Sequence, residues 1–311
     1  MLNLLILLAG FALLIYGAHV FVGASVGIAK KLGIPTVIIG LTIVAMGTSA
    51  PEAVITVTAS LRGSNGLAIG NIVGSNIFNL IFIIGLCAFI KPLPVKLNEV
   101  SKDFWLSIGG AVLLLALLLI GGDSIPRIGS LAMLLIFLVY LTLLVLRGKK
   151  EQVETETTKT ERHILISVLL AIVGGGLIIF GGHLTVESAT DIALSIGVSD
   201  RIIGLTVVAI GTSAPELVTS LVACRKGENE FALGNIIGSN IFNILFILGL
   251  AGVISPLEIV DGLTFDTVFL IIGSLLVFYF VFTGKVLRRF EGAVLVVLYL
   301  GYMLYTLGGY M

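Results

Sequence analysis

Residues 38–60 read IIGLTIVAMGTSAPEAVITVTAS, and residues 202–224 repeat them as IIGLTVVAIGTSAPELVTSLVAC. Each stretch is long and apolar enough to cross a bilayer, and each carries a single carboxylate near its centre, Glu52 or Glu216. A charged side chain at the middle of a span costs roughly 2.5–3.5 kcal/mol on insertion scales, so it indicates a functional site. These two glutamates are therefore the first candidates for chemistry.

A proline precedes each glutamate, and we expect it to break the helix. Pro51 has no N–H to donate to the carbonyl of Gly47, and Pro215 has the same relation to Gly211. Unpaired backbone carbonyls are tolerated within a membrane only where they face protein or a polar cavity. A simple kink is the alternative reading. We favour a polar site because the motif occurs twice and adds hydroxyl groups beside each carboxylate, namely Thr48, Ser49, Thr212 and Ser213.

The two stretches belong to a longer internal repeat. Residues 39–86 align without gaps on residues 203–250 at a constant offset of 164, with 30 identities in 48 positions. Identity is densest at polar residues, which argues against a purely structural duplication. With five predicted spans in each half, the second half enters the membrane from the opposite side, an arrangement common in secondary transporters.

Composition supports a membrane protein, because 58% of the 311 residues are hydrophobic and 12% are charged, against roughly 25% charged in soluble domains. We predict an all-α membrane protein of ten transmembrane helices, arranged as two inverted five-helix repeats: 1–147, then a cytoplasmic linker at 148–162, then 163–311. The predicted spans are 2–28, 36–61, 66–91, 104–121, 126–147, 163–186, 200–224, 231–255, 266–283 and 290–308.

The basic residues predict the orientation of these spans. With the N-terminus outside, 15 of the 18 Lys and Arg residues fall in cytoplasmic loops, and only Arg62, Arg127 and Arg201 lie outside. The positive-inside rule then places both termini on the extracellular side. Residues 1–8 lack a basic region, so we read them as the start of the first span and not as a cleavable signal peptide. We expect a multi-pass protein of the plasma membrane, surrounded by lipid and functional as a monomer.

The third and eighth predicted spans contain AIGNIVGSNIFN at 68–79 and ALGNIIGSNIFN at 232–243. Their glycines form GxxxG pairs, which permit close helix contact: Gly70 with Gly74, and Gly234 with Gly238. Ser75 and Asn79 share one helix face, as do Ser239 and Asn243, and their oxygens could complete a cage. We expect the other asparagines, Asn71, Asn76, Asn235 and Asn240, to brace the packing.

Together these groups predict an all-oxygen cluster of carboxylates, amides, hydroxyls and freed carbonyls. Hard cations prefer such ligands, and Ca²⁺ takes 6–8 oxygens, whereas Mg²⁺ dehydrates reluctantly. Soft metals prefer Cys or His, but Cys87 and Cys224 read as buried small hydrophobes without a disulfide, and we take His19 and His183 as structural. The remaining acids read as solvated surface charge, including Glu187, Asp191, Glu258, Asp261 and Asp266.

Two carboxylates in a poorly solvated site repel each other, and one divalent ion neutralises both. An empty site of this charge is costly to occlude, which favours obligatory exchange over leak. A channel is the first alternative, but channels usually build their filters from several subunits. An enzyme would need a nucleophile–base pair or a catalytic metal, and no deep His, Cys or Lys partners a serine here. The zero net charge gives no argument for a nucleic-acid partner.

The paired GTSAPE and GSNIFN blocks resemble the two alpha-repeats of the calcium/cation antiporter superfamily, in particular its archaeal and bacterial sodium/calcium exchangers. The resemblance covers all ten predicted spans and implies electrogenic exchange of Na⁺ for Ca²⁺ without a cofactor, with the first and sixth spans sliding as a gating pair. It implies Ca²⁺ ligation by Glu52, Glu216, Thr48 and Thr212. It implies flanking Na⁺ sites at Ala45, Ser49 and Ser75 and at Ala209, Ser213 and Ser239, with the alanines acting through carbonyl oxygens, and Asn79 and Asn243 lining the middle site.

One departure from the superfamily concerns Asn79 and Asn243. Some relatives, including potassium-dependent exchangers, carry Asp at one of these two positions. Two asparagines keep the cage two-fold symmetric and make K⁺ co-transport less favourable. Proton/calcium exchangers have different repeat motifs, so H⁺/Ca²⁺ (or another divalent cation) antiport is the alternative function.

Overall fold

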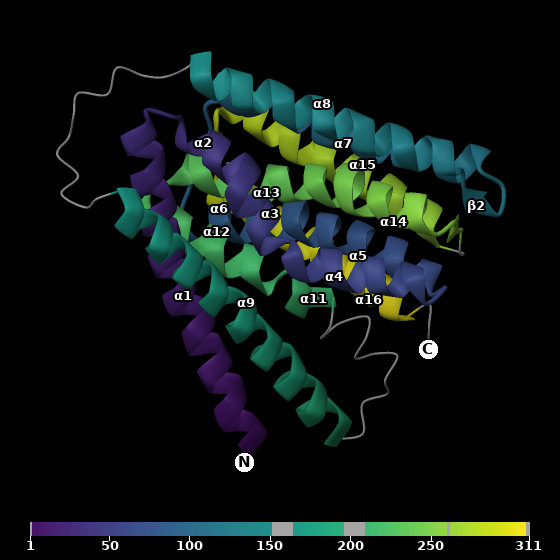
Figure 1. Ribbon diagram of the computed structural model, residues 1–311, viewed down its shortest axis with the longest axis horizontal. Coiled ribbons are helices and arrows are strands. Elements are labelled where there is room, and N and C mark those ends of the chain that lie inside the picture. Colours follow the sequence, from purple (N-terminus) through teal and green to yellow (C-terminus); the bar gives the residue numbers. More distant parts are fainter. Residues whose placement is uncertain (1, 151–163, 196–208, 260–261, 309–311) are drawn as a thin grey trace.

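The computed structural model describes residues 2–150, 164–195, 209–259 and 262–308. Within them the chain is helical, apart from two short strand pairs and the connecting loops (Figure 1). The α-helices are α1 (Leu2–Leu32), α2 (Thr36–Ile39), α3 (Ala45–Thr48), α4 (Ala50–Leu61), α5 (Asn65–Ile77), α6 (Ile84–Ile90), α7 (Leu97–Ile120), α8 (Arg127–Lys150), α9 (Ile164–Ser195), α11 (Ala209–Thr212), α12 (Ala214–Lys226), α13 (Asn229–Ile241), α14 (Gly249–Ile254), α15 (Leu263–Gly284) and α16 (Arg289–Gly308).

Three π-helical segments lie within continuous helices: η1 (Gly40–Val44), η2 (Phe78–Ile83) and η4 (Phe242–Leu248). Eight described helices are long and apolar enough to span a membrane, and a ninth span is the bent pair formed by Thr36–Thr48 and Ala50–Leu61. Of the predicted seventh span, 200–224, only the part from Ala209 onward lies within the described residues. Most of the predicted linker, 151–162, lies outside them.

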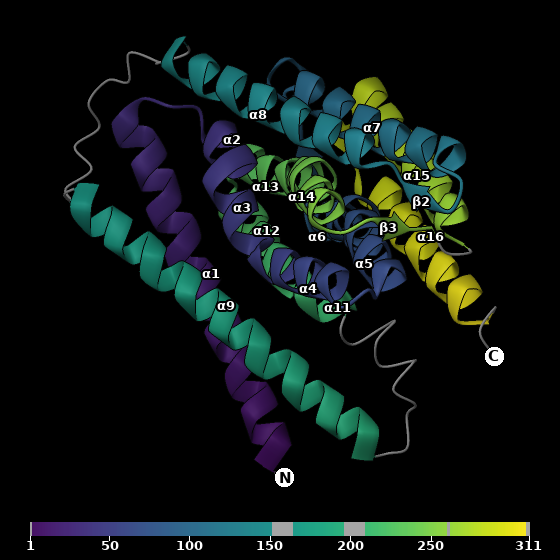
Figure 2. The same cartoon turned by 45° about the vertical axis from the view of Figure 1, so that its right-hand side comes forward.

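The centre of the molecule is formed by the short and broken helices. Most residues of α5, η2, α13 and η4 are buried, and the windows around 66–90 and 229–254 are 78% and 83% buried. Long apolar helices surround this centre, with α7, α8 and α15 on one side and α1 with α9 on the other (Figures 1 and 2). The polar motifs of the sequence therefore lie in the interior of the helix bundle.

Helices α1 and α9 form a pair of their own along one flank, side by side in both views (Figures 1 and 2). Glycines let the two backbones touch. A Cβ added at Gly10 would lie 3.0 Å from the carbonyl oxygen of Gly181, and one added at Gly17 would lie 2.9 Å from that of Gly174. Gly174 and Gly181 follow Gly10 and Gly17 at the same offset of 164 residues. The contact is thus reciprocal and antiparallel.

The two strand pairs tie together loops that are distant in sequence. Strand β1 (Leu93–Pro94) pairs with β4 (Val286–Leu287), and β2 (Ser124–Ile125) pairs with β3 (Leu257–Glu258). An ion pair between Lys96 and Glu230 joins the first of these loop clusters to the start of α13. The hydrogen bond and charge of Glu230, with the charge of Glu99, raise the pKa of the Lys96 ammonium. Each end of the bundle is closed by its own loop cluster.

The glycine pairs of the repeat behave as the sequence predicts where they are described. A Cβ added at Gly234 would lie 2.5 Å from the carbonyl oxygen of Val37, and one at Gly238 would lie 2.7 Å from the Cα of Leu41. Helix α13 therefore packs directly on the backbone of α2 and η1. For Gly70 and Gly74 the equivalent neighbours would be residues 201 and 205, which lie outside the described residues.

Candidate cation site

Both glutamates lie just after a break in the helix, as their prolines predict. Helix α3 ends at Thr48, Ser49 takes φ −84° and ψ 10°, and α4 begins at Ala50. The helix axes of Thr36–Thr48 and Ala50–Leu61 differ by 49°. Ser213 repeats the break between α11 and α12, with φ −87° and ψ 6°. Each glutamate thereby falls in the first turn of a new helix, where the positive end of the helix dipole favours an anion.

The two carboxylates are held by hydrogen bonds that cross between the halves of the chain. Ser49 donates from Oγ to Oε1 of Glu216 at 2.7 Å, and Ser213 donates from Oγ to Oε1 of Glu52 at 2.9 Å. All four side chains are fully buried. The two broken helices thus face each other across the centre of the bundle.

The second oxygen of each carboxylate has no hydrogen-bond donor. Among the described residues, Glu52 Oε2, Glu216 Oε2, Ser75 Oγ, Asn79 Oδ1 and Asn243 Oδ1 are buried without a hydrogen-bond partner. A buried polar group left without a partner costs about 1–3 kcal/mol. These five oxygens belong to predicted ligands; oxygens of other residues, such as Thr219 Oγ1 and Asn240 Oδ1, also lack a partner among the described residues. Buried oxygens left free in this way are what a site for a desolvated cation requires.

The π-helical segments place the asparagines of the third and eighth predicted spans. Asn79 lies in η2 and Asn243 in η4, and both are fully buried. A π-bulge changes which face a helix presents, and such bulges are frequent at functional sites. The sequence analysis did not predict these bulges, because their residues are apolar and compatible with ordinary helix.

Backbone oxygen is also turned toward the cluster. The carbonyl of Ala45 accepts hydrogen bonds from Thr48 Oγ1 at 3.4 Å and from Ser239 Oγ at 3.5 Å, and Ser239 in turn lies 3.4 Å from Glu216 Oε1. Thr212 is buried in α11. Ala209 begins α11, and its side chain lies outside the described set.

The remaining asparagines brace the centre, as the sequence predicts. Asn76 and Asn240 each donate to the backbone carbonyl of the other, at 3.1 and 3.2 Å. Within each half, Asn71 donates to Thr56 and Asn235 to Ser220, both at 3.0 Å. The sequence analysis did not predict that Thr56 and Ser220 accept these bonds, because Ser and Thr are common in apolar helices and give no specific signal.

The brace is not fully symmetric. Asn243 donates to Oδ1 of Asn76 at 3.0 Å, whereas Asn79 makes no corresponding bond to Asn240 in the part of the chain that is described. The two equivalent positions therefore differ in the structure, although the sequence alone presents them as identical.

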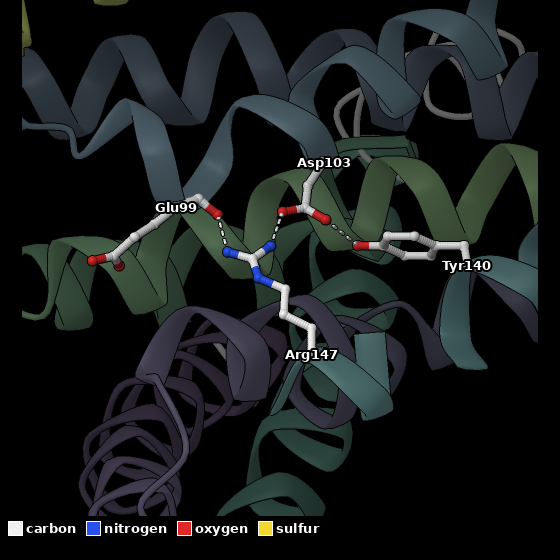
Figure 3. Close-up of polar contacts among 4 residues, drawn as sticks. All are labelled: Glu99, Asp103, Tyr140 and Arg147. Atoms are coloured by element: carbon white, nitrogen blue, oxygen red, sulfur yellow. Dashed lines mark hydrogen bonds and ion pairs between the residues drawn. The ribbon is translucent and has the colours of Figure 1, made fainter. Parts of the chain in front are cut away.

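Two acids contradict the prediction that every acid but the two glutamates is solvated. Asp103 is only 3% exposed, and its carboxylate accepts hydrogen bonds from Tyr140 and Arg147, each at 3.0 Å (Figure 3). Asp266 is partly buried and accepts a hydrogen bond from Tyr302 at 2.9 Å. Both lie near helix ends, where position along the chain does not reveal burial. Neither joins the glutamate cluster.

The cysteines and histidines lie apart from the carboxylates. Cys87 and Cys224 are buried and free, as predicted. His19 and His183 are exposed on α1 and α9. Within the described ranges, no three or more His, Cys, Asp and Glu residues gather into a metal-binding group. The chemistry of the centre is therefore that of two carboxylates surrounded by neutral oxygens, which suits a hard cation bound reversibly.

Solved structures share this fold. The sodium–calcium exchanger NCX_Mj, soaked with Na⁺ and Sr²⁺, matches with a TM-score of 0.85 and 33% identity over 97% of this chain and 98% of that one. The fold, with its buried pair of carboxylates, defines a multi-pass membrane transporter of cations.

Sequence comparison gives the family. The pattern of the sodium/calcium exchanger proteins matches residues 2–146 and 166–308, and the chain belongs to that family. The putative antiporter CaxA of Alkalimonas amylolytica is 39% identical over 95% of each chain. The sodium/calcium exchanger MaX1 of Methanosarcina acetivorans is 32% identical over 97% of each. These relatives are exchangers and antiporters rather than enzymes, so cation/Ca²⁺ antiport is the activity of the family and of this chain.

Proposed function

We propose that this protein exchanges Na⁺ for Ca²⁺ across the plasma membrane by alternating access. The observation that carries the proposal is the reciprocal bonding of Ser49 to Glu216 and Ser213 to Glu52, with one free oxygen left on each carboxylate. Ca²⁺ would lie between the glutamates, with Thr48 and Thr212 as further ligands.

The Na⁺ ions would occupy flanking positions. On one side we assign Ser49, Ser75 and the carbonyl of Ala45, and on the other Ser213, Ser239 and the carbonyl of Ala209. Asn79 and Asn243 would line the middle. The unpaired oxygens of Ser75, Asn79 and Asn243 support this assignment, as does the carbonyl of Ala45, which points toward Ser239.

Electrostatics explains why the ions would be exchanged and not leaked. Two buried carboxylates close together repel each other strongly in a medium of low dielectric constant. One Ca²⁺ or several Na⁺ ions cancel this repulsion, so the closed intermediate forms readily only when cations are bound. Each half-cycle then carries one type of ion, and net transport without a counter-ion is slow.

We also propose the ten-span inverted topology, with both termini outside and a single chain as the working unit. The loop contacts support it. Strand β1 with β4 joins two loops that the charge pattern places in the cytoplasm, and β2 with β3 joins two loops that it places outside. Lys30 pairs with Glu228, and both lie in predicted cytoplasmic loops. In this topology, residues 1–147 and 163–311 are the two inverted halves, joined by the linker 148–162.

Counter-ion identity is tested by transport. Purified protein in liposomes loaded with Na⁺, with K⁺ or with a pH gradient is assayed for uptake of radioactive Ca²⁺. We expect uptake that requires internal Na⁺, carries net charge and is lost in Glu52→Gln and Glu216→Gln. Uptake driven by the pH gradient alone would replace Na⁺ with H⁺, and full activity in both variants would refute the site.

A further inference from the structure

A lysine at the end of α12 bonds to the backbone of α1. Lys226 donates from Nζ to the carbonyl oxygen of His19 at 2.7 Å, in the middle of α1. A carbonyl inside a helix already accepts from the N–H four residues on, so the ammonium uses its second lone pair. Gly23 leaves room for the lysine, because a Cβ added there would lie 3.5 Å from Nζ. The bond thereby ties α1 to the helix that carries Glu216 in its first turn.

This contact between α1 and α12 occurs in one half of the repeat only. Helix α1 packs against α12, whereas α9 and α4, the equivalent pair, make no contact of similar extent among the described residues. The N-terminal end of α1 and the C-terminal end of α9 project away from the central helices in both views (Figures 1 and 2). The charge pattern places these projecting ends outside and the Lys226 contact on the cytoplasmic side. The structure is therefore closed between α1 and α12 at the cytoplasmic side, without the matching contact at the outer side.

The offset of 164 residues identifies the side chains that would make the matching contact. Three residues take the places of the lysine, of the carbonyl acceptor and of the glycine: Arg62, His183 and Glu187. Arg62 is exposed, and its side chain has no hydrogen-bond or ion-pair partner among the described residues. Glu187 contacts His183 on its own helix at 3.2 Å, and both side chains are more than half exposed. The outer set is therefore present in the sequence but not engaged across the helices.

Exchange of the two halves' arrangements would engage the outer set. In a transporter of inverted repeats, one half can take up the arrangement that the other half leaves. Helix α9 would then pack against α4, and the guanidinium of Arg62 would take the position against α9 that Nζ of Lys226 holds against α1. The residue at that point is Glu187 where the first contact has Gly23. Arg62 would therefore meet a carboxylate in addition to the carbonyl of His183.

We propose that Lys226 and Arg62 are positioning residues that hold α1 and α9 in two alternate arrangements. Lys226 on the carbonyl of His19 stabilises the form that is closed at the cytoplasmic side. Arg62 on Glu187 stabilises the form that is closed at the outer side. The inference rests on the alternating access proposed above and adds the side chains that stabilise each end state. One charge-assisted contact shifts a ratio of populations about tenfold, and it is weak enough to break in every cycle.

Distances between pairs of spin labels, measured by double electron–electron resonance, test this assignment. Labels at Leu32→Cys and Arg225→Cys report the separation of α1 and α12 at the cytoplasmic side. Labels at Leu61→Cys and Leu194→Cys report that of α4 and α9 at the outer side. All four positions are exposed. The native cysteines are first replaced by the residues at the equivalent positions of the other half, as Cys87→Ala and Cys224→Ser.

The full chain is measured in lipid nanodiscs with Ca²⁺ present, so that the end states interconvert. Lys226→Met removes the charge and keeps the length of the side chain. We expect the ratio of outer-closed to cytoplasm-closed molecules to rise about tenfold, with the first label pair moving apart and the second moving together. Adding Glu187→Gln to Lys226→Met should reverse most of this shift, because Arg62 then lacks its carboxylate. The control, Lys31→Met, removes an exposed charge from the same end of α1 and should leave both distances unchanged.

Three results would overturn the assignment. Unchanged distances in Lys226→Met would show that its bond does not hold α1, and an equal shift in Lys31→Met would show an effect of general surface charge. A shift that Glu187→Gln does not reverse would show that Arg62 has no partner on α9. Unfolding cannot imitate the expected result, since a second substitution would not restore it. Unchanged distances together with intact Ca²⁺ uptake would reject the positioning residues and leave the proposed function standing.

Discussion

Each carboxylate at the centre of this protein depends on a serine from the opposite half of the chain. Ser49 and Ser213 occupy equivalent positions in the repeat. Each donates a hydrogen bond to one oxygen of the glutamate in the opposite half, and the second oxygen of that carboxylate has no partner among the described residues. A hydroxyl can rotate from donating to a carboxylate to coordinating a cation through its own lone pairs. The same pair of side chains can therefore hold the site together with and without ions.

The proposed assignment of some ligands to Na⁺ and others to Ca²⁺ can be tested at single residues. Because Ser49 is assigned to Na⁺ and not to Ca²⁺, Ser49→Ala should raise the Na⁺ concentration that half-displaces bound Ca²⁺ by about tenfold, equivalent to about 1.4 kcal/mol. The affinity for Ca²⁺ without Na⁺ should change much less. Radioactive Ca²⁺ binding to the purified variant, with and without Na⁺, measures both quantities.

Ser213→Ala should behave in the same way, because the two halves supply equivalent oxygens. Thr142→Ala is the control, since that hydroxyl bonds to a carbonyl of its own helix on the exposed surface. Loss of Ca²⁺ affinity as large as the loss of Na⁺ affinity would place the serines in the calcium site.

At the scale of the helices, the sequence predicts the breaks before Glu52 and Glu216 but not the π-helical segments that hold Asn79 and Asn243. Proline before Glu52 and Glu216 removes a backbone donor wherever it occurs, so the breaks at Ser49 and Ser213 follow from local chemistry. The π-helical segments around Asn79 and Asn243 depend on contacts with other helices, and their local sequence gives no sign of them. The same holds for the burial of Asp103, which depends on Arg147 from the next helix.

The contact between α1 and α9 belongs to this scale as well. The two glycines of each helix let the backbones meet along a narrow seam, and the side chains of Leu13, Leu177 and Thr185 pack against these glycines. Small residues at such a seam permit close packing in lipid. It also suits the sliding that resemblance to the exchangers implies for the first and sixth spans.

Filling this seam should be costly. Gly17→Ala would place a Cβ 2.8 Å from the Cβ of Leu177, so we expect a loss of about 1–3 kcal/mol, as in other overpacked interiors. Gly176→Ala is the matched control on α9, because a Cβ there meets no atom within 4 Å. The thermal unfolding midpoint in detergent should fall for Gly17→Ala and hold or rise for Gly176→Ala. Equal midpoints for both variants would show that the described seam does not exist.

At the scale of the whole molecule, the repeat explains most of the architecture. Equivalent residues make equivalent contacts in the glutamate pair, the exchange between Asn76 and Asn240, the glycine seam and the strand pairs. The constant offset predicts which residues correspond, and the inverted repeat with one deep acid in each half predicts that these acids meet at the centre. The crossed bonds of Ser49 to Glu216 and of Ser213 to Glu52 agree with that prediction. Departures from the repeat then stand out, such as the bond from Asn243 to Asn76 that Asn79 does not match among the described residues.

The central claim is that Glu52 and Glu216 form a single Ca²⁺ site shared by the two halves. Isothermal titration calorimetry of the purified protein without Na⁺ tests it most directly. We predict one bound Ca²⁺ per chain, with affinity reduced at least about a hundredfold by either Glu52→Gln or Glu216→Gln, since ligand charge sets Ca²⁺ affinity. Two bound ions in the unmodified protein, with each variant keeping one at full affinity, would contradict the account.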